Sequence, residues 1–290
     1  MACTEPKPVC EVGAELGEGP MWDERSQALW FVDIKNDAIH RYDPASGAQR
    51  GWKAPEFTAF IFPASSGDFI VGLKSGLFRF DPDSGSFDRI NRIDSEYPAN
   101  RLNDGAVDPE GRLWFGTMDN DEKAKTGSFY RFTSGEVTPT GIGDIVVTNG
   151  PAVSPDGRTL YLVDTFARSI DQYEIRDDGT LGPRRSFVTI EEGAGFPDGP
   201  SVDSEGHVWI GLYCGWAARR YAPDGRLAAE VKFPTANVTK IAFGGADLRI
   251  GFATTARQGM KPEELQQQPL AGHLFKFECD VPGVECPLVR

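Results

Sequence analysis

The sequence predicts an all-β fold, a six-bladed β-propeller with four antiparallel strands in each blade. A short motif recurs at intervals of about 40 to 50 residues. Each copy is followed by a Gly-rich turn and then by further strands of bulky, often alternating apolar residues. Six copies span the 290 residues, so we expect residues 1–290 to form a single propeller domain.

The recurring motif is clearest at residues 148–157, Thr-Asn-Gly-Pro-Ala-Val-Ser-Pro-Asp-Gly. Aligning the copies on the apolar residue that follows Asn149 by four positions brings one residue of each repeat into an equivalent place, which we call the slot. The slot residues are Glu18, Thr58, Asn103, Asn149, Asp198 and Thr239. Because the first strand of every propeller blade lines the central channel, we expect these side chains to converge there.

The second strands are the easiest to place. They are predicted at Leu29–Ile34, Phe69–Leu73, Leu113–Met118, Leu160–Asp164, Val208–Tyr213 and Leu248–Thr254. Residues 119–127 and 257–272 are insertions, which are either solvated loops or a rim around one mouth of the channel, and Pro262 is placed to begin a short helix. Pro8–Ala14 precedes the first repeat and is predicted to add a strand to the last blade, which closes the ring.

Composition excludes several classes of partner. The net charge is −13 and the isoelectric point about 4.8, so nucleic acid and anionic membranes would be repelled. No apolar run reaches membrane-spanning length, and the first 20 residues lack the basic start and apolar stretch of a signal peptide. We therefore expect a cytoplasmic protein, and a monomer because no dimerising segment is evident.

Cysteine and histidine usage is equally restrictive. The five cysteines form no CxxC pair, and the three histidines form neither HxH nor HExxH. A zinc knuckle, a disulfide framework and a histidine-rich metal site are all unsupported, so the cysteines are expected to be reduced thiols. The GxSxG motif of serine hydrolases is also absent.

The slot residues themselves point to a cation. Channel positions of propellers ordinarily carry small or apolar residues, whereas four of the six slots carry Glu, Asn, Asn and Asp. Taken singly, each could bond backbone amides at a strand start. Two carboxylates held together repel one another unless one is protonated or a cation lies between them. Glu18, Asn149 and Asp198 offer only oxygen atoms, which suits a hard or borderline divalent ion.

Several motifs together resemble the SMP-30/gluconolactonase/LRE family, which includes regucalcin and bacterial sugar lactonases. The motifs are Glu18-Gly19-Pro20, Arg101-Leu102-Asn103-Asp104-Gly105, Trp114-Phe115-Gly116-Thr117-Met118, Asn149-Gly150, Pro197-Asp198-Gly199, Phe243-Gly244-Gly245 and Gln268-Pro269-Leu270-Ala271-Gly272. The resemblance implies a six-bladed propeller in which Glu18, Asn149 and Asp198 bind one divalent metal, while Arg101 and Asn103 bind a sugar lactone. Ca²⁺, Zn²⁺, Mn²⁺, Mg²⁺ and Fe²⁺ all occur in the family.

The family also implies a substrate contact from the first insertion. In animal members a glutamate after the Gly-Thr-Met motif reaches the substrate, whereas here the equivalent loop reads Asp119-Asn120-Asp121. Asp121 is therefore the candidate, and its shorter side chain could shift the sugar preference. In overall appearance the sequence is more similar to bacterial xylonolactonases and gluconolactonases than to regucalcin.

The implied activity is hydrolysis of a lactone such as xylono-, arabinono- or gluconolactone to the free aldonic acid. The metal would polarise the carbonyl, and Asp198 would serve both as a ligand and as the general base for water. Arg101 would orient the polyol and favour the anionic intermediate, although it could instead pair with Asp104 at the surface. The alternatives are an organophosphate or other ester hydrolase using the same site, and a noncatalytic calcium-binding propeller.

Overall fold

The computed structural model describes residues 3–290 and is almost entirely β-structure. Four sheets have four strands each and run in chain order from the first strand to the fourth. They are β2 (Gly17–Asp23), β3 (Ala28–Asp33), β4 (Ala38–Tyr42), β5 (Gln49–Lys53); β6 (Thr58–Pro63), β7 (Phe69–Leu73), β8 (Gly76–Asp81), β9 (Ser86–Arg92); β10 (Asn100–Val107), β11 (Leu113–Asp119), β12 (Phe129–Thr133), β13 (Glu136–Pro139); and β14 (Thr148–Val153), β15 (Thr159–Asp164), β16 (Ser169–Glu174), β17 (Arg185–Thr189).

The remaining strands form one eight-stranded sheet in the order β1-β24-β23-β22-β18-β19-β20-β21. Its strands are β18 (Phe196–Val202), β19 (Val208–Tyr213), β20 (Ala217–Tyr221), β21 (Leu227–Lys232), β22 (Val238–Gly244), β23 (Ile250–Thr255), β24 (Leu274–Glu278) and β1 (Lys7–Cys10). The two halves of this sheet are joined only through the parallel pair of Gly199 in β18 and Lys240 in β22. Each half therefore has the same four-stranded make-up as the other sheets.

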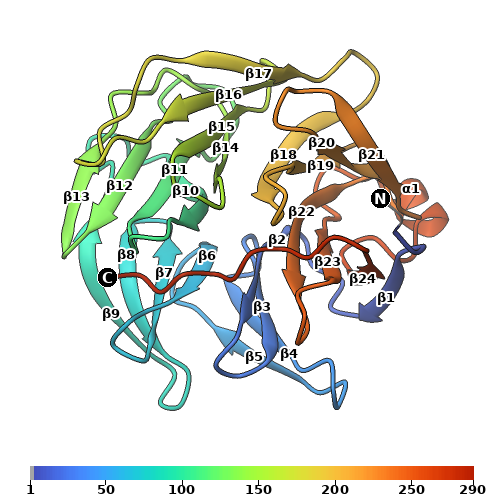
Figure 1. The fold of residues 1–290 in the computed structure, drawn as a ribbon. Helices are drawn as coiled ribbons and strands as arrows, with labels where there is room; N and C mark the ends of the chain where they lie inside the picture. Colours follow the sequence, from blue (N-terminus) through green and yellow to red (C-terminus); the bar gives the residue numbers. More distant parts are fainter. Residues whose placement is uncertain (1–2) are drawn as a thin grey trace.

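The sheets are arranged radially about a central axis in the manner of a β-propeller (Figure 1). The first strands β2, β6, β10, β14, β18 and β22 lie innermost, and β5, β9, β13, β17 and β21 lie outermost. The inner strands are buried along nearly their whole length, whereas the outer strands are largely exposed. This gradient explains why the inner and second strands are the easiest to recognise in the sequence.

Every inner strand carries an irregularity at the slot. The pairing register with the second strand shifts between Glu18 and Met21, Thr58 and Phe60, Leu102 and Gly105, Asn149 and Ala152, Pro197 and Pro200, and Val238 and Ile241. Such bulges re-aim side chains that would otherwise follow the regular alternation of a strand. All six slot residues are buried.

Large aromatic side chains fill the space between neighbouring sheets. Phe60 is fully buried against Phe62 and Phe115, with ring centroids 5.5 and 6.1 Å away. Gly72 on the adjacent strand leaves the room that the Phe60 ring occupies, since a Cβ there would collide with it. Burying one such ring stabilises the fold by about 1.5–3 kcal/mol, so truncating Phe60 would loosen the wall of the channel.

The N-terminal segment closes the ring, as predicted. Strand β1 pairs antiparallel with β24, and the Thr4 amide donates to the Glu278 carbonyl at 2.9 Å. Cys3 and Cys279 form a disulfide beside this pairing, which corrects the expectation that all five cysteines are reduced thiols. The two cysteines are 276 residues apart, so no local spacing could have indicated the bond.

The C-terminal segment that follows β24 crosses the ring to the side of β8 and β9 (Figure 1). Val289 forms a parallel β-bridge with Ala64, and the Arg290 amide donates to the Gly111 carbonyl at 3.0 Å. Residues 284–287 help to line a cavity of about 150 Å³ in the channel. Across residues 3–290, no helix combines the length and apolar character needed to cross a membrane, and α1 (Pro262–Gln267) has only six residues.

Candidate functional site

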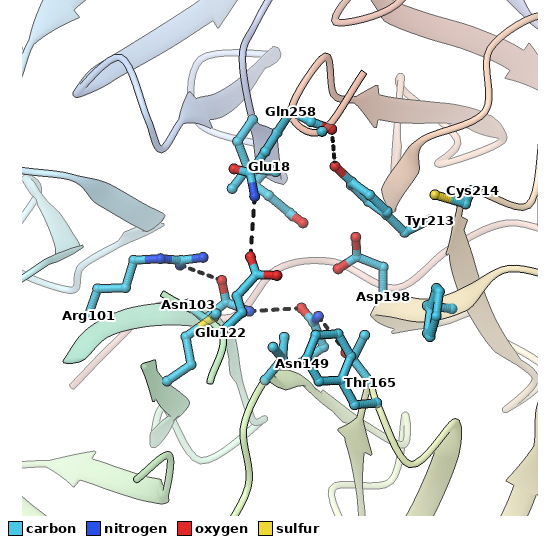
Figure 2. A pocket seen from close by; sticks show the side chains of 16 residues that line it. Glu18, Arg101, Asn103, Glu122, Asn149, Thr165, Asp198, Tyr213, Cys214 and Gln258 are labelled. Atoms are coloured by element: carbon cyan, nitrogen blue, oxygen red, sulfur yellow. Dashed lines mark hydrogen bonds between the residues drawn. The ribbon is translucent and has the colours of Figure 1, made fainter. Parts of the chain in front are cut away.

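A second and larger cavity, of about 240 Å³, contains the polar slot residues. Glu18, Asn103, Asn149 and Asp198 all line it, each from a different inner strand, together with Arg101 of β10 (Figure 2). These residues are separated by up to 180 positions in the sequence, so the repeat brings them together. The threonine slots Thr58 and Thr239 do not belong to the lining.

Glu18 and Asp198 form a buried carboxylate pair. Their residues are 4% and 6% exposed, and Figure 2 shows both side chains directed into the pocket. Burial, followed by repulsion from Asp104, raises the pKa of Glu18. Burial, followed by repulsion from Glu18, raises the pKa of Asp198 well above its ordinary range. A site of this kind favours either a proton or a positive ion between the two carboxylates.

A chain of hydrogen bonds fixes the amide side chains next to this pair. Arg101 Nη1 donates to Asn103 Oδ1 at 2.5 Å, and Asn103 Nδ2 donates to Asn149 Oδ1 at 3.1 Å. Asn149 Nδ2 donates to Thr165 Oγ1 at 2.9 Å, and that hydroxyl donates to the Pro197 carbonyl at 3.0 Å. The chain ends one residue before Asp198, so it ties three inner strands to the carboxylate pair.

Arg101 is buried inside the pocket wall and is not at the surface. It is 2% exposed, and burial lowers its pKa to about 10, so the guanidinium stays charged at neutral pH. Among the described residues its Nε has no hydrogen-bond partner, and its Nη1 donates to the Leu102 carbonyl and to Asn103. The alternative that Arg101 pairs with Asp104 at the surface is wrong, because Asp104 is itself buried and pairs with Lys240.

The two insertions meet at the mouth of the pocket. Glu122 from residues 119–127 and Gln258 from residues 257–272 both line it, and Gln258 Nε2 donates to Glu122 Oε1 at 3.2 Å (Figure 2). The backbone carbonyl of Gln258 accepts from the Tyr213 hydroxyl and, at 3.2 Å, from Asn237. Both insertions therefore form a rim around the channel mouth, which was one of the two interpretations that the sequence left open.

Asp121, the candidate for the loop contact, lies outside this lining. Its side chain is 68% exposed and approaches Lys123 at 3.9 Å. The next residue, Glu122, lines the pocket instead, and its backbone has the left-handed φ of +58°. The loop turns at this point because the Asp119 carboxylate accepts the amides of residues 121, 123 and 124.

Part of the pocket lining is aromatic. Phe166, Phe196 and Tyr213 line it, and the rings of Phe166 and Phe196 meet edge to face with centroids 6.1 Å apart. Phe166 is 47% exposed, which is unusual for so large an apolar side chain. An exposed aromatic surface beside polar groups can stack on the C–H face of a sugar ring.

The oxygen atoms present fit a hard divalent cation. Two carboxylates and the Asn149 amide are available, and the Asn149 Oδ1 uses one of its two lone pairs to accept from Asn103. Residues 3–290 contain no cluster of three or more His, Cys, Asp and Glu side chains that could hold a metal. A cation here would thus have two charged ligands and an amide, with the remaining positions open to water or substrate.

Comparison with known proteins places the chain in a family. The family described as SMP-30/gluconolactonase/LRE-like matches residues 16–257, which include every lining residue that the slots contribute. The chain belongs to this family. It is 35% identical to a 6-deoxy-6-sulfogluconolactonase of Pseudomonas putida, with 94% of each chain covered. It is 33% identical to a pentonolactonase of Haloferax volcanii, with 86% of this chain and 84% of that one covered.

The SMP-30/gluconolactonase/LRE-like fold extends over the whole chain. A crystal structure described as a calcium-binding protein, regucalcin, from Agrobacterium tumefaciens superposes with a TM-score of 0.94. The two chains are 30% identical, and the match covers 98% of this chain and 96% of the other. The resemblance inferred from the sequence motifs is thereby confirmed at the level of the family.

Sequence reasoning missed several residues of the site. Thr165 directly follows a second strand, and Glu122 and Gln258 lie in the two insertions. The positions of Glu122 and Gln258 are not periodic, so the repeat could not select them, whereas Thr165 and Cys214 each directly follow a second strand. The usable signal was that both insertions contain polar side chains and follow the second strand of their blade.

For the sugar lactone that the family resemblance implies as substrate, replacing Gln258 with alanine is expected to raise KM by about 2- to 10-fold and to change kcat less. The variant removes the hydrogen bond that joins the side chains of the two insertions at this mouth, a bond worth about 0.5–1.5 kcal/mol. Steady-state kinetics would measure both constants. Gln258→Glu, which sets a second carboxylate against Glu122, should raise KM further, and an unchanged KM in both variants would contradict the role.

The metal-free protein is expected to lose thermal stability as pH rises from about 4 to 8. The pKa values of Glu18 and Asp198 are raised in the folded chain, so their protonated forms favour folding below the unfolded pKa. That contribution is lost as the pH rises through the folded pKa. Scanning calorimetry should show a flatter dependence in Glu18→Gln, and Ca²⁺ added at pH 8 should raise Tm. An identical pH slope in Glu18→Gln would count against the carboxylate pair.

Proposed function

We propose that the chain is a six-bladed propeller, a single domain over residues 1–290, that hydrolyses a sugar-derived lactone to the free aldonic acid with the help of a divalent cation. The observation that carries this proposal is the pocket in which a buried carboxylate pair, the Asn149 amide and the Arg101 guanidinium meet. The names of the relatives support it, because two of them are lactonases of sugar acids.

The cation would be held by Glu18, Asn149 and Asp198. When bound, it would polarise the lactone carbonyl as a Lewis acid and offset the negative charge of the carboxylate pair. Oxygen ligands suit Ca²⁺, Mg²⁺ and Mn²⁺, and the same three side chains can also bind Zn²⁺ or Fe²⁺. The calcium-binding description of the solved relative makes Ca²⁺ the first ion to test.

Asp198 would accept the proton of the attacking water. Its position in the pocket brings it next to Glu18, and burial makes it a stronger base than an exposed aspartate. The hydrogen-bond chain that ends at the Pro197 carbonyl holds the neighbouring backbone still, so the carboxylate does not need to be reoriented for each turnover.

Arg101 and Asn103 would act on the substrate side. The Arg101 guanidinium has donors left over after its bonds to Leu102 and Asn103, and its charge favours the oxyanion of the tetrahedral intermediate. Asn103 has both ends of its amide engaged, since it accepts from Arg101 and donates to Asn149 and to the Thr148 carbonyl. We therefore propose that Asn103 positions Arg101 and Asn149. Its Oδ1 keeps one lone pair with which it can accept from a substrate hydroxyl.

The pocket offers two kinds of wall to a polyhydroxylated ring. Glu122 presents carboxylate oxygens, and Gln258 beside it donates to one of them through Nε2. Phe166 and Phe196 present apolar surface to the same pocket. This division suits xylono-, arabinono- and gluconolactone, whose hydroxyl groups and C–H faces point in different directions.

Acid release followed with a pH indicator tests the proposal. The protein is treated with chelator, each divalent metal is added back, and xylono-, arabinono-, galactono- and gluconolactone are compared with the uncatalysed blank. Turnover that requires a metal would support the lactonase. If every lactone opens at the blank rate although Ca²⁺ binds, the pocket is a binding site, or one for another ester such as an organophosphate.

A further inference from the structure

The position directly after the slot contains a pattern of its own. It is small in four repeats, where it is Gly19, Ala59, Gly150 and Gly199, and charged in the other two. Asp104 and Lys240 occupy those two positions, on inner strands that lie on opposite sides of the channel (Figure 1). Lys240 Nζ lies 2.6 Å from Asp104 Oδ1 and 2.8 Å from Oδ2, and donates to the Gly105 carbonyl at 3.2 Å.

This ion pair is among the most deeply buried in the molecule. Asp104 is 1% exposed and Lys240 6% exposed. Taking two charges out of water is costly, and replacing such a pair with apolar residues is often neutral or stabilising. Stability of the fold is therefore not a sufficient reason for charges at these two positions. Their neighbours in space adjoin Asn149 and Asp198, which points to a role at the cation site.

Both members of the pair contact the segments that carry the proposed cation ligands. The Gly150 amide, next to Asn149, donates to Asp104 Oδ2 at 3.1 Å. Lys240 pairs with Gly199, next to Asp198, and a Cβ on Gly199 would lie only 2.7 Å from the Lys240 Cδ. Gly199 therefore provides the space through which the lysine side chain crosses to Asp104.

The pair also acts electrostatically on the third ligand. Inside the buried channel, the Asp104 charge repels the Glu18 and Asp198 carboxylates and the Lys240 charge attracts them. Asp104 thus adds to the field that attracts a cation, and Lys240 reduces it. The two residues therefore act on the Glu18–Asp198 site with opposite charges.

We propose that Lys240 and Asp104 form a charge-balancing pair beneath the carboxylates, which sets the affinity of the pocket for its divalent cation. They are positioning residues, because neither lines the pocket that contains the carboxylates. The inference rests on the cation site of the proposed function and goes beyond it, because it assigns the control of affinity to two residues that are not ligands.

Calcium titration calorimetry on chelator-treated protein tests the pair. Lys240→Met removes the balancing charge, so we expect Ca²⁺ to bind at least about tenfold more tightly. Asp104→Asn leaves the lysine without its partner, so we expect binding at least about tenfold weaker. A pair that only holds the fold together would weaken Ca²⁺ binding in both variants, so the opposite signs are the diagnostic result.

The double variant Asp104→Asn with Lys240→Met keeps the test decisive if a single variant fails to fold. It restores a neutral pair, and the amide oxygen of the introduced asparagine can still accept from the Gly150 amide, so Ca²⁺ affinity should return to within about threefold of the unaltered chain. Arg220→Met is the matched control, because Arg220 and Asp203 form an equally buried pair at 2.7 Å outside the pocket. It should lower thermal stability and leave Ca²⁺ affinity unchanged.

The outcomes separate this inference from the proposed function. If the unaltered chain binds Ca²⁺ and both single variants bind it more weakly, or the double variant stays tenfold away, the charge-balancing pair is overturned while the cation site stands. If the unaltered chain binds neither Ca²⁺ nor any other divalent ion, the cation site fails and the inference fails with it. Opposite shifts that cancel in the double variant would establish the pair.

Discussion

Asp198→Asn is expected to lower kcat for lactone opening by about 10²- to 10⁴-fold, the range that a positioned general base contributes. The replacement has nearly the same shape but cannot accept the proton of the attacking water. It also removes one charged oxygen from the pocket, where Asp198 and Glu18 are the two buried carboxylates. Acid release at saturating cation concentration measures kcat separately from cation binding.

Two further variants separate the roles within this prediction. Glu18→Gln removes a ligand charge but not the base, so its activity should recover as the cation concentration rises, whereas that of Asp198→Asn should not. Asp164→Asn is the control, because Asp164 ends the neighbouring strand β15 but does not line the pocket. If Asp198→Asn keeps more than about a tenth of kcat at saturating cation, the base lies elsewhere.

The fold could be predicted because a propeller repeats its burial pattern. Inner and second strands are buried in every blade, so the same apolar run recurs, and β7 and β19 begin and end at the predicted residues. The prediction is less accurate where a turn residue is apolar. The apolar pattern places Leu248 in a strand, but its φ is +57° and its amide donates to the Gly245 carbonyl in a turn, so β23 begins at Ile250.

The site was predictable only as far as it is periodic. The slots gave Glu18, Asn103, Asn149 and Asp198 because one register in each inner strand faces the channel. Contacts between insertions follow no period: Gln258 meets Glu122 across 136 residues. The difference between Asp121 and Glu122 depends on a loop that turns about the Asp119 carboxylate, and spacing alone cannot reveal that turn.

The Lys240–Asp104 pair shows a different limit. Both residues stand in the register of the repeat, one position beyond the slot, and the pattern was present in the sequence. Its meaning depends on geometry, because only the closed ring brings residues 136 positions apart to within 2.6 Å. The sequence therefore contained the signal, opposite charges at the same register of two repeats. Only the closed ring of sheets shows that these two charges meet.

Arg101→Ala is expected to lower kcat/KM for a sugar lactone by about 10²- to 10³-fold, the loss typical of removing one oxyanion donor. Although burial lowers its pKa to about 10, the guanidinium is charged at neutral pH, so the variant removes a full positive charge from the pocket. Arg101→Lys should recover only part of the activity, because a lysine cannot both bond Asn103 and present further donors in a fixed plane. Thermal denaturation of both variants checks that the buried replacement still folds.

Comparing two substrates shows which part of the lactone Arg101 recognises. γ-Butyrolactone contains the same ester but no hydroxyl groups, so an Arg101 that orients the polyol should matter far less for it than for gluconolactone. Equal losses on both substrates would mean that Arg101 acts on the carbonyl oxygen alone. In that case the choice among sugars would depend on Glu122, Gln258 and the aromatic wall, because those lining residues belong to the loops and strand ends around the mouth.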